Sequence, residues 1–329
     1  MSPDPISPEH GSTEPEPNPR AVHRPVLLEE VVAHLGLAEG MVLVDGTVGA
    51  GGHAAALARK VGASGRVIGL DRDPAMLALA GAATVGLPVT LVQSPYSAIR
   101  RVLDELGIAV VHGIVLDLGL SSDQLAWADR GFSFATEGPL DMRFESGTDP
   151  DRAPGPTAAE LVATLPEEEL ARIFFEYGEE RFSRRIARRI VETRRAEPIM
   201  TTHQLAELVR RCIPGKYRHG PIDPATRVFQ ALRIAVNEEL EHLDATLAIL
   251  PEILAPEGRA AIISFHSLED RRVKWAFRNE PRLTVLTKKP VTATVQEVSL
   301  NPRARSAKLR VAERCPNPKQ AGMTSPNPS

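Results

Sequence analysis

The sequence predicts an α/β protein: a doubly wound, parallel sheet into which a helical segment is inserted. Three observations predict this fold class. Short apolar runs rich in β-branched residues alternate with helical patterns between residues 41 and 119. The alternation then stops, and residues 130–220 read as a polar loop followed by several helices. Strand, helix and strand patterns return near the end of the chain.

The first half of the predicted sheet is made of short strands that end in Asp, Gly or Gln. A helical pattern follows each of the first three, and the second of these helices begins after Asp73, a favourable N-cap, with Pro74 at its first position. Alternating strands and helices favour parallel strands with helices on both faces. The predicted strands are 41–46, 66–71, 89–93 and 113–119, and the predicted helices are 53–60, 74–83 and 97–106.

The second half starts with a Gly-, Pro- and Asp-rich stretch, 130–152, and with helices over 157–211 that carry many arginines. Asp223 and Pro224 then open one long predicted helix, in which apolar residues recur at helical spacing from Val228 to Leu247. The last predicted elements are a strand at 258–265, a helix at 268–278 and a strand at 308–312.

The domain organisation follows from these patterns. A chain of 329 residues is long for a single core, so one sheet domain with an insertion is the simplest division. The first residues are rich in proline and acidic side chains, which is typical of a disordered tail. The expected parts are a tail at 1–22, sheet domain at 23–129, helical insertion at 130–220, sheet domain at 221–315 and a tail at 316–329.

Composition limits the class of protein. No apolar run is long enough to span a bilayer, and the N-terminus lacks the apolar stretch of a secretory signal, so a cytoplasmic protein is expected. Cys212 and Cys315 are the only cysteines and have no metal-ligand spacing, so neither a disulfide framework nor a metal site is expected. The net charge is −3, which argues against indiscriminate binding of nucleic acid but leaves local basic patches open.

A glycine-rich turn, DGTVGAGGH, joins the first predicted strand to its helix at Asp45 to His53. Such turns let a ligand approach the backbone, and the following helix offers free N–H groups. Asp71 ends the next strand, where a carboxylate can accept hydrogen bonds from ribose hydroxyls. The glycine spacing differs from the dinucleotide pattern G-x-G-x-x-G and is closer to turns that bind S-adenosylmethionine, which favours methyl transfer over hydride transfer.

The chain resembles the ribosomal RNA small subunit methyltransferase H family. Matching segments run almost continuously from His23 to Arg314 and include HRPVLLEEVV, VDGTVGAGGH, GIVLDLGLSSDQL, ATRVFQALRIAVNEEL, ISFHSLEDRRVK and NPRARSAKLRVAER. The resemblance implies a class I S-adenosylmethionine-dependent methyltransferase fold, with a seven-stranded, Rossmann-like sheet. It also implies methyl transfer to N4 of a cytidine in the decoding region of bacterial 16S rRNA, with the small ribosomal subunit as the partner.

The resemblance implies that S-adenosylmethionine contacts seven residues: Gly51, Gly52, His53, Asp71, Tyr96, Asp117 and Gln124. Other interpretations stay open, since His53 could contribute only its backbone, Tyr96 could belong to the core, and Gln124 could be a solvated loop residue. Two positions depart from the family pattern. Tyr96 stands where Phe is usual, which keeps an aromatic face for adenine, and Asp123 stands where Pro is usual.

Methylation of cytosine N4 needs an acceptor for the amino hydrogens, because the nitrogen lone pair is delocalised into the ring. Asp117, at the end of a predicted strand, is the best-placed candidate, followed by Asn237 and His266. No SPPY or DPPY segment of the amino-methylating DNA enzymes occurs in the chain. A structural histidine bonded to a neighbouring loop is the other interpretation of His266.

Two basic stretches are candidates for phosphate contacts with RNA. At helical spacing the arginines of the first share much of one face, opposite Ile186 and Ile190. A merely solvated face, or the arginine bias of a GC-rich genome, is the other interpretation. The candidates are Arg181, Arg184, Arg185, Arg188 and Arg189 in the first stretch, and Arg303 and Arg305 in the second.

Two rival functions follow from the same residues. A methyltransferase acting on a small molecule or a protein would use the same glycine-rich turn, and an assembly factor that had lost catalysis would bind small subunits without turnover. The oligomeric state, monomer or homodimer, and the choice between naked rRNA and an assembled subunit stay open. The insertion favours a folded or assembled target, which would present its base turned out of the stack.

Overall fold

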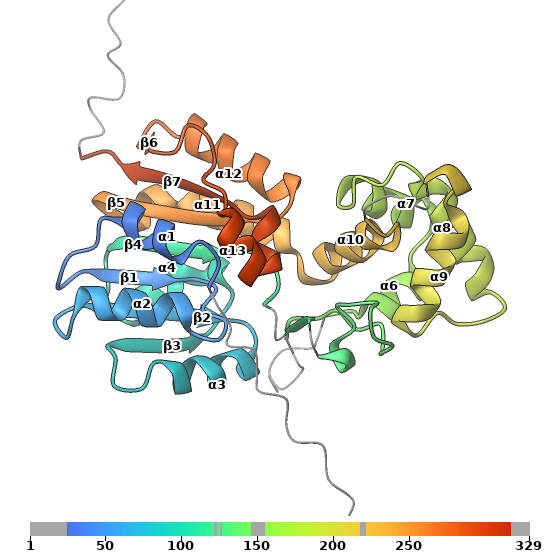
Figure 1. Cartoon of the computed structure of the whole chain (residues 1–329), viewed down its shortest axis with the longest axis horizontal. Coiled ribbons are helices and arrows are strands. Elements are labelled where there is room, and N and C mark those ends of the chain that lie inside the picture. The colour runs from blue at the N-terminus through green and yellow to red at the C-terminus, as the bar shows by residue number, and fades with distance from the viewer. Residues whose placement is uncertain (1–24, 122–123, 126, 146–154, 218–221, 317–329) are drawn as a thin grey trace, which may run out of the picture.

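The computed structural model describes residues 25–121, 124–125, 127–145, 155–217 and 222–316. The predicted tail at 1–22 and all but the first residue of the tail at 316–329 lie outside these residues, as does Asp123. In the described part the chain forms a sheet domain beside a separate group of helices (Figure 1).

A seven-stranded sheet is the centre of the larger part, in the order β3-β2-β1-β4-β5-β7-β6. Neighbouring strands from β3 to β5 are parallel, whereas β7 runs antiparallel to both β5 and β6. The strands are β1 Val42–Asp45, β2 Arg66–Asp71, β3 Val89–Gln93, β4 Val111–Asp117, β5 Leu254–Ser264, β6 Leu283–Val285 and β7 Lys308–Arg314. The doubly wound α/β class with an inserted helical segment and seven strands is therefore confirmed.

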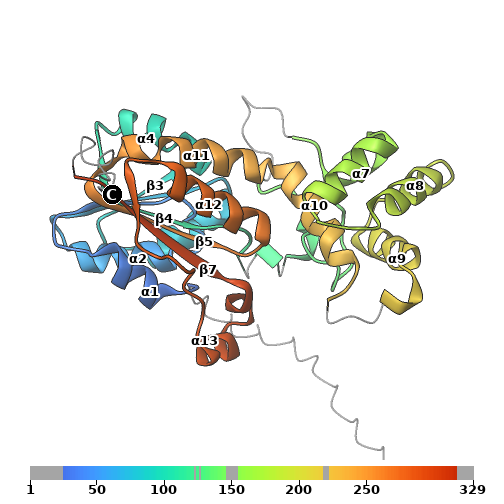
Figure 2. The same cartoon turned by 90° about the horizontal axis from the view of Figure 1, so that it is seen from above.

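Both faces of the sheet are covered by helices (Figure 2). Side chains alternate between two cores, so that Val44 and Ile114 belong to one and Leu43 and Val115 to the other. This is why the strands read as continuous apolar runs. One core is closed by α4 Ile99–Glu105, α11 Glu239–Ile253 and α12 Ser267–Asn279, and the other by α1 Leu28–Leu35, α2 Gly52–Val61 and α3 Pro74–Ala83.

The smaller part is a group of helices with a core of its own, which includes Phe174, Ile186 and Leu232. It consists of α6 Ala158–Thr164, α7 Glu167–Glu176, α8 Ser183–Arg194, α9 Thr202–Cys212 and α10 Ala225–Asn237. Thr157 and Thr201 cap α6 and α9 with reciprocal side-chain bonds, as expected for Thr followed three residues later by Glu or Gln. Because α10 belongs to this core, the helical part extends past residue 220, the boundary expected from the sequence.

The single long helix expected after Pro224 is wrong. The structure has two helices, α10 and α11, separated at Glu238, whose φ of 50° is left-handed. The apolar spacing continues across the break because each helix needs an apolar face, but α10 packs in the helical core and α11 on the sheet. The sequence pattern indicates an apolar face along both α10 and α11. It does not indicate that these two faces pack against different cores.

Smaller differences concern ends and short elements. The structure adds α1, β6 and α13 Val295–Leu300, which the sequence patterns did not predict. The helix expected at 97–106 begins as a 3₁₀ turn, Tyr96–Ala98, and the strand expected at 258–265 starts earlier, at Leu254. None of the described helices combines the length and the apolar character that crossing a membrane requires.

Candidate functional site

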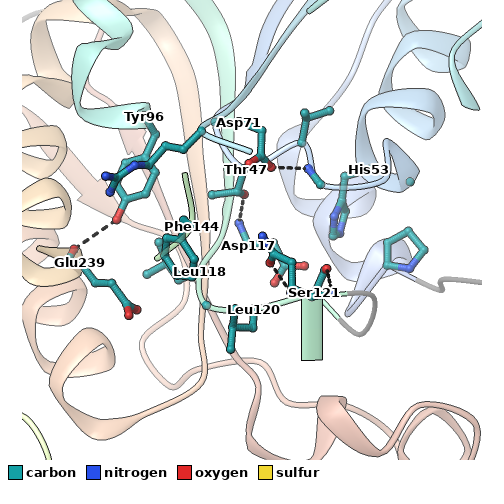
Figure 3. Close-up of a pocket in the computed structure, with 18 of the residues that line it drawn as sticks. Thr47, His53, Asp71, Tyr96, Asp117, Leu118, Leu120, Ser121, Phe144 and Glu239 are labelled. Carbon is teal, nitrogen blue, oxygen red and sulfur yellow. Dashed lines mark hydrogen bonds between the residues drawn. The ribbon is translucent and has the colours of Figure 1, made fainter. Parts of the chain in front are cut away.

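A cleft opens at the carboxyl ends of β1 and β4, where the strand order reverses (Figure 3). Open α/β sheets bind ligands at this kind of switch point. The cleft has a volume of about 850 Å³, including its open mouth. Its lining combines the glycine-rich turn, the ends of the first four strands and residues from the second half of the chain: Pro25, Gly46–Gly49, Gly52, His53, Asp71, Arg72, Ser94, Tyr96, Asp117–Ser121, Gln124, Phe144, Glu239, Glu269 and Arg303.

The glycine-rich turn is held by backbone contacts. Gly49 and Gly51 have φ values of 51° and 87°, which L side chains rarely adopt. The Gly49 N–H donates to Asp71 Oδ2 at 2.9 Å, and Val48 N–H donates to the carbonyl of Leu70 at 2.8 Å. The turn is therefore tied to the end of β2, and α2 begins directly after it at Gly52. The turn, which lines the cleft at Gly46–Gly49 and Gly52, therefore brings the start of α2 to the cleft, where helix N–H groups can meet a ligand.

Two carboxylates lie at the strand ends, of which Asp45 is fully buried and Asp71 is half-buried in the wall of the cleft. Burial raises the pKa of Asp45, which is 0% exposed, to about 7, although the Thr47 N–H bonded to it has the opposite effect. Burial also raises the pKa of Asp71 to about 6. The backbone N–H groups of Asp73 and Gly49, which donate hydrogen bonds to its carboxylate, act in the opposite direction and lower the pKa. The pKa of Asp71 is therefore raised toward neutral pH at the carboxyl end of β2, where its side chain lines the cleft.

Asp117 ends β4 and lines the middle of the cleft. Its backbone N–H donates to Thr47 Oγ1 at 2.6 Å, so the glycine-rich turn and the end of β4 hold each other in place. Figure 3 shows Asp117 beside Thr47, with Asp71 on the same side of the cleft. The structure thus brings Asp71 and Asp117, two predicted site residues, to one cavity.

Tyr96 lies on the opposite side of the cleft from His53 (Figure 3). Its hydroxyl donates to the backbone carbonyl of Glu239 at 3.2 Å, which joins the end of β3 to the start of α11. The aromatic ring therefore lines the cleft rather than belonging only to the core.

His53 and Gln124 line the cleft, but their polar atoms already have partners within the protein. The His53 ring donates from Nε2 to the carbonyl of Val26 at 3.0 Å, and burial lowers the pKa of His53 to about 4, so the ring is neutral. Gln124 accepts from the Ser121 N–H and donates to Asp73 Oδ2 at 3.3 Å. Both residues hold the walls of the cleft.

Asn237 lies at the end of α10, is 2% exposed and does not line the cleft. Its Oδ1 accepts from the Phe144 N–H at 2.8 Å, and its Nδ2 donates to the carbonyls of Met142 and Arg233. These bonds tie the end of α10 to the loop that carries Phe144. The geometry gives Asn237 a positioning role.

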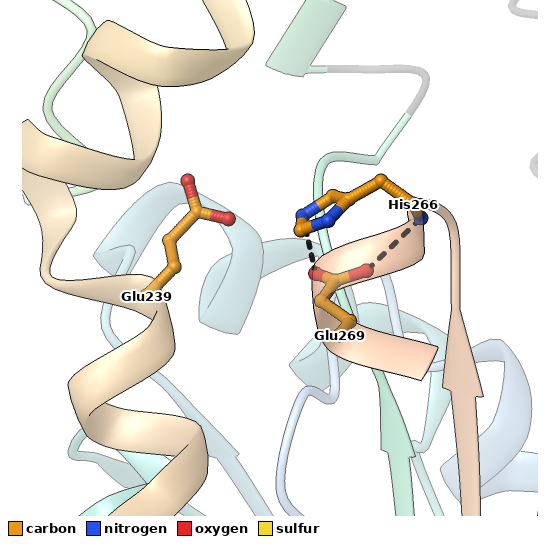
Figure 4. A group of neighbouring side chains, drawn as sticks. All are labelled: Glu239, His266 and Glu269. Carbon is orange, nitrogen blue, oxygen red and sulfur yellow. Dashed lines mark hydrogen bonds and ion pairs between the residues drawn. The ribbon is translucent and has the colours of Figure 1, made fainter. Parts of the chain in front are cut away.

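His266 precedes α12 and does not line the cleft itself. Its Nε2 lies 3.2 Å from Oε1 of Glu269, which does (Figure 4). The structure therefore places His266 behind a cleft carboxylate rather than beside Asp117.

The predicted arginine face on α8 is present. Arg184, Arg185, Arg188 and Arg189 are exposed, while Ile186 and Ile190 are buried in the helical core. Arg181, with three of these arginines, lines a surface groove between α7 and α8. The Arg181 guanidinium lies 3.7 Å from the ring centre of Tyr217.

The second basic stretch is in a different place. Arg303 lines the cleft and lies over the Phe265 ring, and Arg305 is exposed. Both directly follow α13, which lies against the sheet domain, whereas α8 is at the far end of the helical part (Figure 1). The structure does not bring the two basic stretches together.

The cleft also contains residues that were not anticipated as site residues, and four of these have charged or aromatic side chains: Arg72, Phe144, Glu239 and Glu269. Arg72 donates to Glu145 and to the backbone carbonyl of Asn237, across the seam between the two parts. The sequence provides little indication of a site at these four residues, because they lie in segments predicted to be loops or helix surfaces. Only the folded chain brings them beside the glycine-rich turn.

Comparison with known proteins identifies the family. The model of the MraW methylase family matches residues 20–315. The ribosomal RNA small subunit methyltransferase H of Synechococcus sp. (strain JA-2-3B'a(2-13)) is 52% identical over 302 residues, covering 89% of this chain and 92% of that protein. The proteins of the same name from Syntrophotalea carbinolica and Sorangium cellulosum are 49% and 51% identical, covering 89% and 91% of this chain and 98% and 93% of theirs. The chain belongs to the MraW methylase family.

Proposed function

We propose that this protein transfers a methyl group from S-adenosylmethionine to N4 of a cytidine in the decoding region of 16S rRNA, within the small ribosomal subunit and in the cytoplasm. Membership of the MraW methylase family and the names of the relatives support methylation of small-subunit rRNA. One observation carries the proposal: the cleft at the switch point joins the glycine-rich turn, Asp71, Tyr96 and Asp117.

The donor set of the cleft fits S-adenosylmethionine. Asp71 stands where it can accept from the ribose hydroxyls, and Tyr96 offers an aromatic face for the adenine. Gly52 and His53 line the cleft where the glycine-rich turn enters α2, whereas Gly51 does not line it and lies against Ala80 on α3. A turn of this kind suits a ligand with no pyrophosphate, and Gln124 holds the wall behind it. When bound, S-adenosylmethionine supplies a methyl carbon that its sulfonium sulfur has already activated.

The chain's own residues then have two tasks, to orient the target base and to take up its proton. Thr47 fixes the backbone at Asp117, so that this carboxylate has a defined place at the end of β4. There it accepts from the N4 amino group, which lets the nitrogen become pyramidal and lose a proton as it is methylated. Positioning the base is the larger contribution, because the reaction needs nitrogen, methyl carbon and sulfur in line.

Asn237 and His266, the other catalytic candidates, act in this proposal through other residues. Asn237 holds the Phe144 loop, and His266 holds Glu269. The arginine face of α8 contacts rRNA phosphates away from the cleft, and Arg303 and Arg305 do so near its mouth.

The test incubates the purified protein with labelled S-adenosylmethionine and small subunits from cells that lack this methylation, followed by nucleoside analysis. We expect label in N4-methylcytidine, and a loss of about 100-fold or more in the rate for Asp117→Ala. Asp104→Asn is the control, since it changes an exposed carboxylate on α4.

Label in a different nucleoside, or on free metabolites without RNA, would contradict the proposal. Binding of subunits with no label at all would favour the assembly-factor reading. A parallel incubation with naked 16S rRNA separates the two substrate forms, and we expect the assembled subunit to take up more methyl groups.

A further inference from the structure

The cleft has a wall that the proposed cofactor contacts do not use. Phe144, Glu239, Glu269 and Arg303, called here the far wall, line the cleft together with the glycine-rich turn. They come from the loop leading into the helical part, from the starts of α11 and α12, and from the turn after α13. An aromatic ring, two carboxylates and a guanidinium are the groups that recognise a nucleotide by stacking, by its amino group and by its phosphate.

Glu239 is the best acceptor on this wall. It is only 7% exposed, and its carboxylate reaches toward the cleft (Figure 3). Arg233 on α10 donates to it twice, from Nε to Oε1 at 2.7 Å and from Nη2 to Oε2 at 2.9 Å. A carboxylate accepts about four hydrogen bonds, so two positions remain after the Arg233 pair. Arg233 therefore fixes the carboxylate in one orientation and leaves it able to accept from a ligand.

Glu269 has less capacity left. Its Oε2 accepts from the backbone N–H groups of Phe265 and His266, and its Oε1 lies against the His266 ring (Figure 4). Burial opposes its charge, but the His266 ring, the Phe265 N–H and the nearby Arg233 hold the pKa of Glu269 below its usual range. Glu269 is thus an ionised carboxylate used mainly inside the protein, which leaves Glu239 as the group for the ligand.

The ligand for Glu239 should carry a neutral amino group. Ligand atoms of Glu239, His266 and Glu269 lie within 4.8 Å of one another, as in a metal site. However, a metal ion there would face the guanidinium of Arg233, which already lies against Glu239. An amino group donates a hydrogen bond without bringing a second full positive charge to this place.

We propose that Glu239 is a specificity-determining residue, which accepts a hydrogen bond from the exocyclic amino group of the target cytosine. This inference rests on the proposed function. Phe144, held by Asn237, packs against the base, and Arg303 contacts its phosphate. Uracil presents a carbonyl oxygen at the same position, which a carboxylate repels, so Glu239 discriminates cytosine from uracil.

The adenine of S-adenosylmethionine also has an amino group that could donate to Glu239. We assign the far wall to the target base instead, for two reasons. The proposed cofactor contacts lie on the glycine-rich turn, at the ends of β2 to β4 and on the segment just after β4. Glu239 instead follows directly on the helical part, and its fixing residue, Arg233, belongs to α10 of that part. The helical part is the one that the proposed function assigns to RNA.

The experiment compares the wild type with Glu239→Gln, and uses Glu252→Gln as the matched control, because Glu252 is exposed near the other end of α11. Small subunits reconstituted with cytidine or with uridine at the target position compete with labelled subunits. The ratio of the two inhibition constants measures discrimination, and calorimetry measures the affinity for S-adenosylmethionine. We expect Glu239→Gln to reduce the ratio by about 10-fold or more, with the cofactor affinity unchanged.

An unchanged ratio, even with slower turnover, would overturn the inference and leave Glu239 a structural role. A loss of cofactor affinity that matches the loss of turnover would overturn it in favour of adenine. If Glu239→Gln does not unfold cooperatively, Glu239→Asp is used in its place. Asp keeps the negative charge, but its shorter side chain moves the carboxylate away from the base. The ratio of the two inhibition constants should again fall. Failure of the wild type to methylate subunits would instead refute the proposed function, and the inference with it.

Discussion

The sheet part and the helical part use their charged side chains in opposite ways. At the ends of the strands, Asp45 and Asp71 are withdrawn from solvent and fixed by backbone N–H groups. On α8 the arginines project from a helix whose other face is buried, and two of them, Arg188 and Arg189, pair with glutamates at the protein surface. A buried carboxylate gives precise geometry and a shifted pKa, whereas exposed cations give affinity that salt screens.

The largest expected effect concerns the cofactor side. Asp71→Asn should weaken binding of S-adenosylmethionine by about 10- to 100-fold, because a charged acceptor for the ribose is lost. In the wild type the affinity should rise as the pH increases through about 6, the pKa to which burial raises Asp71, since the carboxylate is the better acceptor. Calorimetry between pH 5 and pH 8 measures the affinity of the wild type and of Asp71→Asn. If the affinity of Asp71→Asn still rises with pH, a group other than Asp71 causes the pH dependence.

A smaller effect is expected on the helical side. Replacing Arg184, Arg185 and Arg188 with Gln should weaken small-subunit binding by about 10-fold at physiological salt and flatten its dependence on salt concentration. Cofactor affinity should not change, because the three side chains lie in the α7–α8 groove and not in the cleft. Arg101→Gln, on an exposed surface of the sheet part, serves as the control. Equal losses in both variants would mean that the α8 face has no special role.

The third effect concerns the stability of the fold and not the binding of a ligand. Burial raises the pKa of Asp45 to about 7, above its value in the unfolded chain, so the folded state holds a proton that the unfolded state releases. The stability that this group contributes is therefore present below about pH 4 and is lost as the pH rises toward 7. Asp45→Asn should flatten this dependence, so that its stability relative to the wild type is higher at pH 8 than at pH 4 by a few kcal/mol, about 1.4 kcal/mol for each unit by which the pKa is raised. Urea unfolding at both pH values measures it, and parallel curves for the two proteins would contradict the assignment.

The features that the sequence could predict are mostly local patterns in the sheet part. Strands buried on both faces and a glycine-rich turn are local patterns, and β2, α3 and β3 lie at the predicted residues. Asp73 caps α3 through a bond from the Ala75 N–H, as its place before Pro74 indicates. Asp71 and Asp117 could be placed because the carboxyl ends of parallel strands share one edge of a sheet.

The remaining features depend on contacts between distant segments. The break at Glu238 arises because α10 and α11 serve different cores, which no window of sequence shows. Asn237 carries an amide that could serve in catalysis, yet its side-chain hydrogen bonds go to backbone groups, two of them in the loop at 142–144. Glu239 is one of several glutamates on helices, and only the folded chain places it in the cleft beside Tyr96.

The bonds of Asn237 also have a consequence for how such a molecule can change over evolutionary time. The chain enters the helical part through the loop at 142–144 and leaves it at Asn237, and this one side chain fastens entry to exit. The two ends of the helical part therefore lie side by side where it joins the sheet domain. Segments with adjacent ends can be lengthened, shortened or exchanged without disturbing the host. Over evolutionary time the helical part can thus be refitted to a target of different shape while β4, α11 and the cleft between them stay as they are.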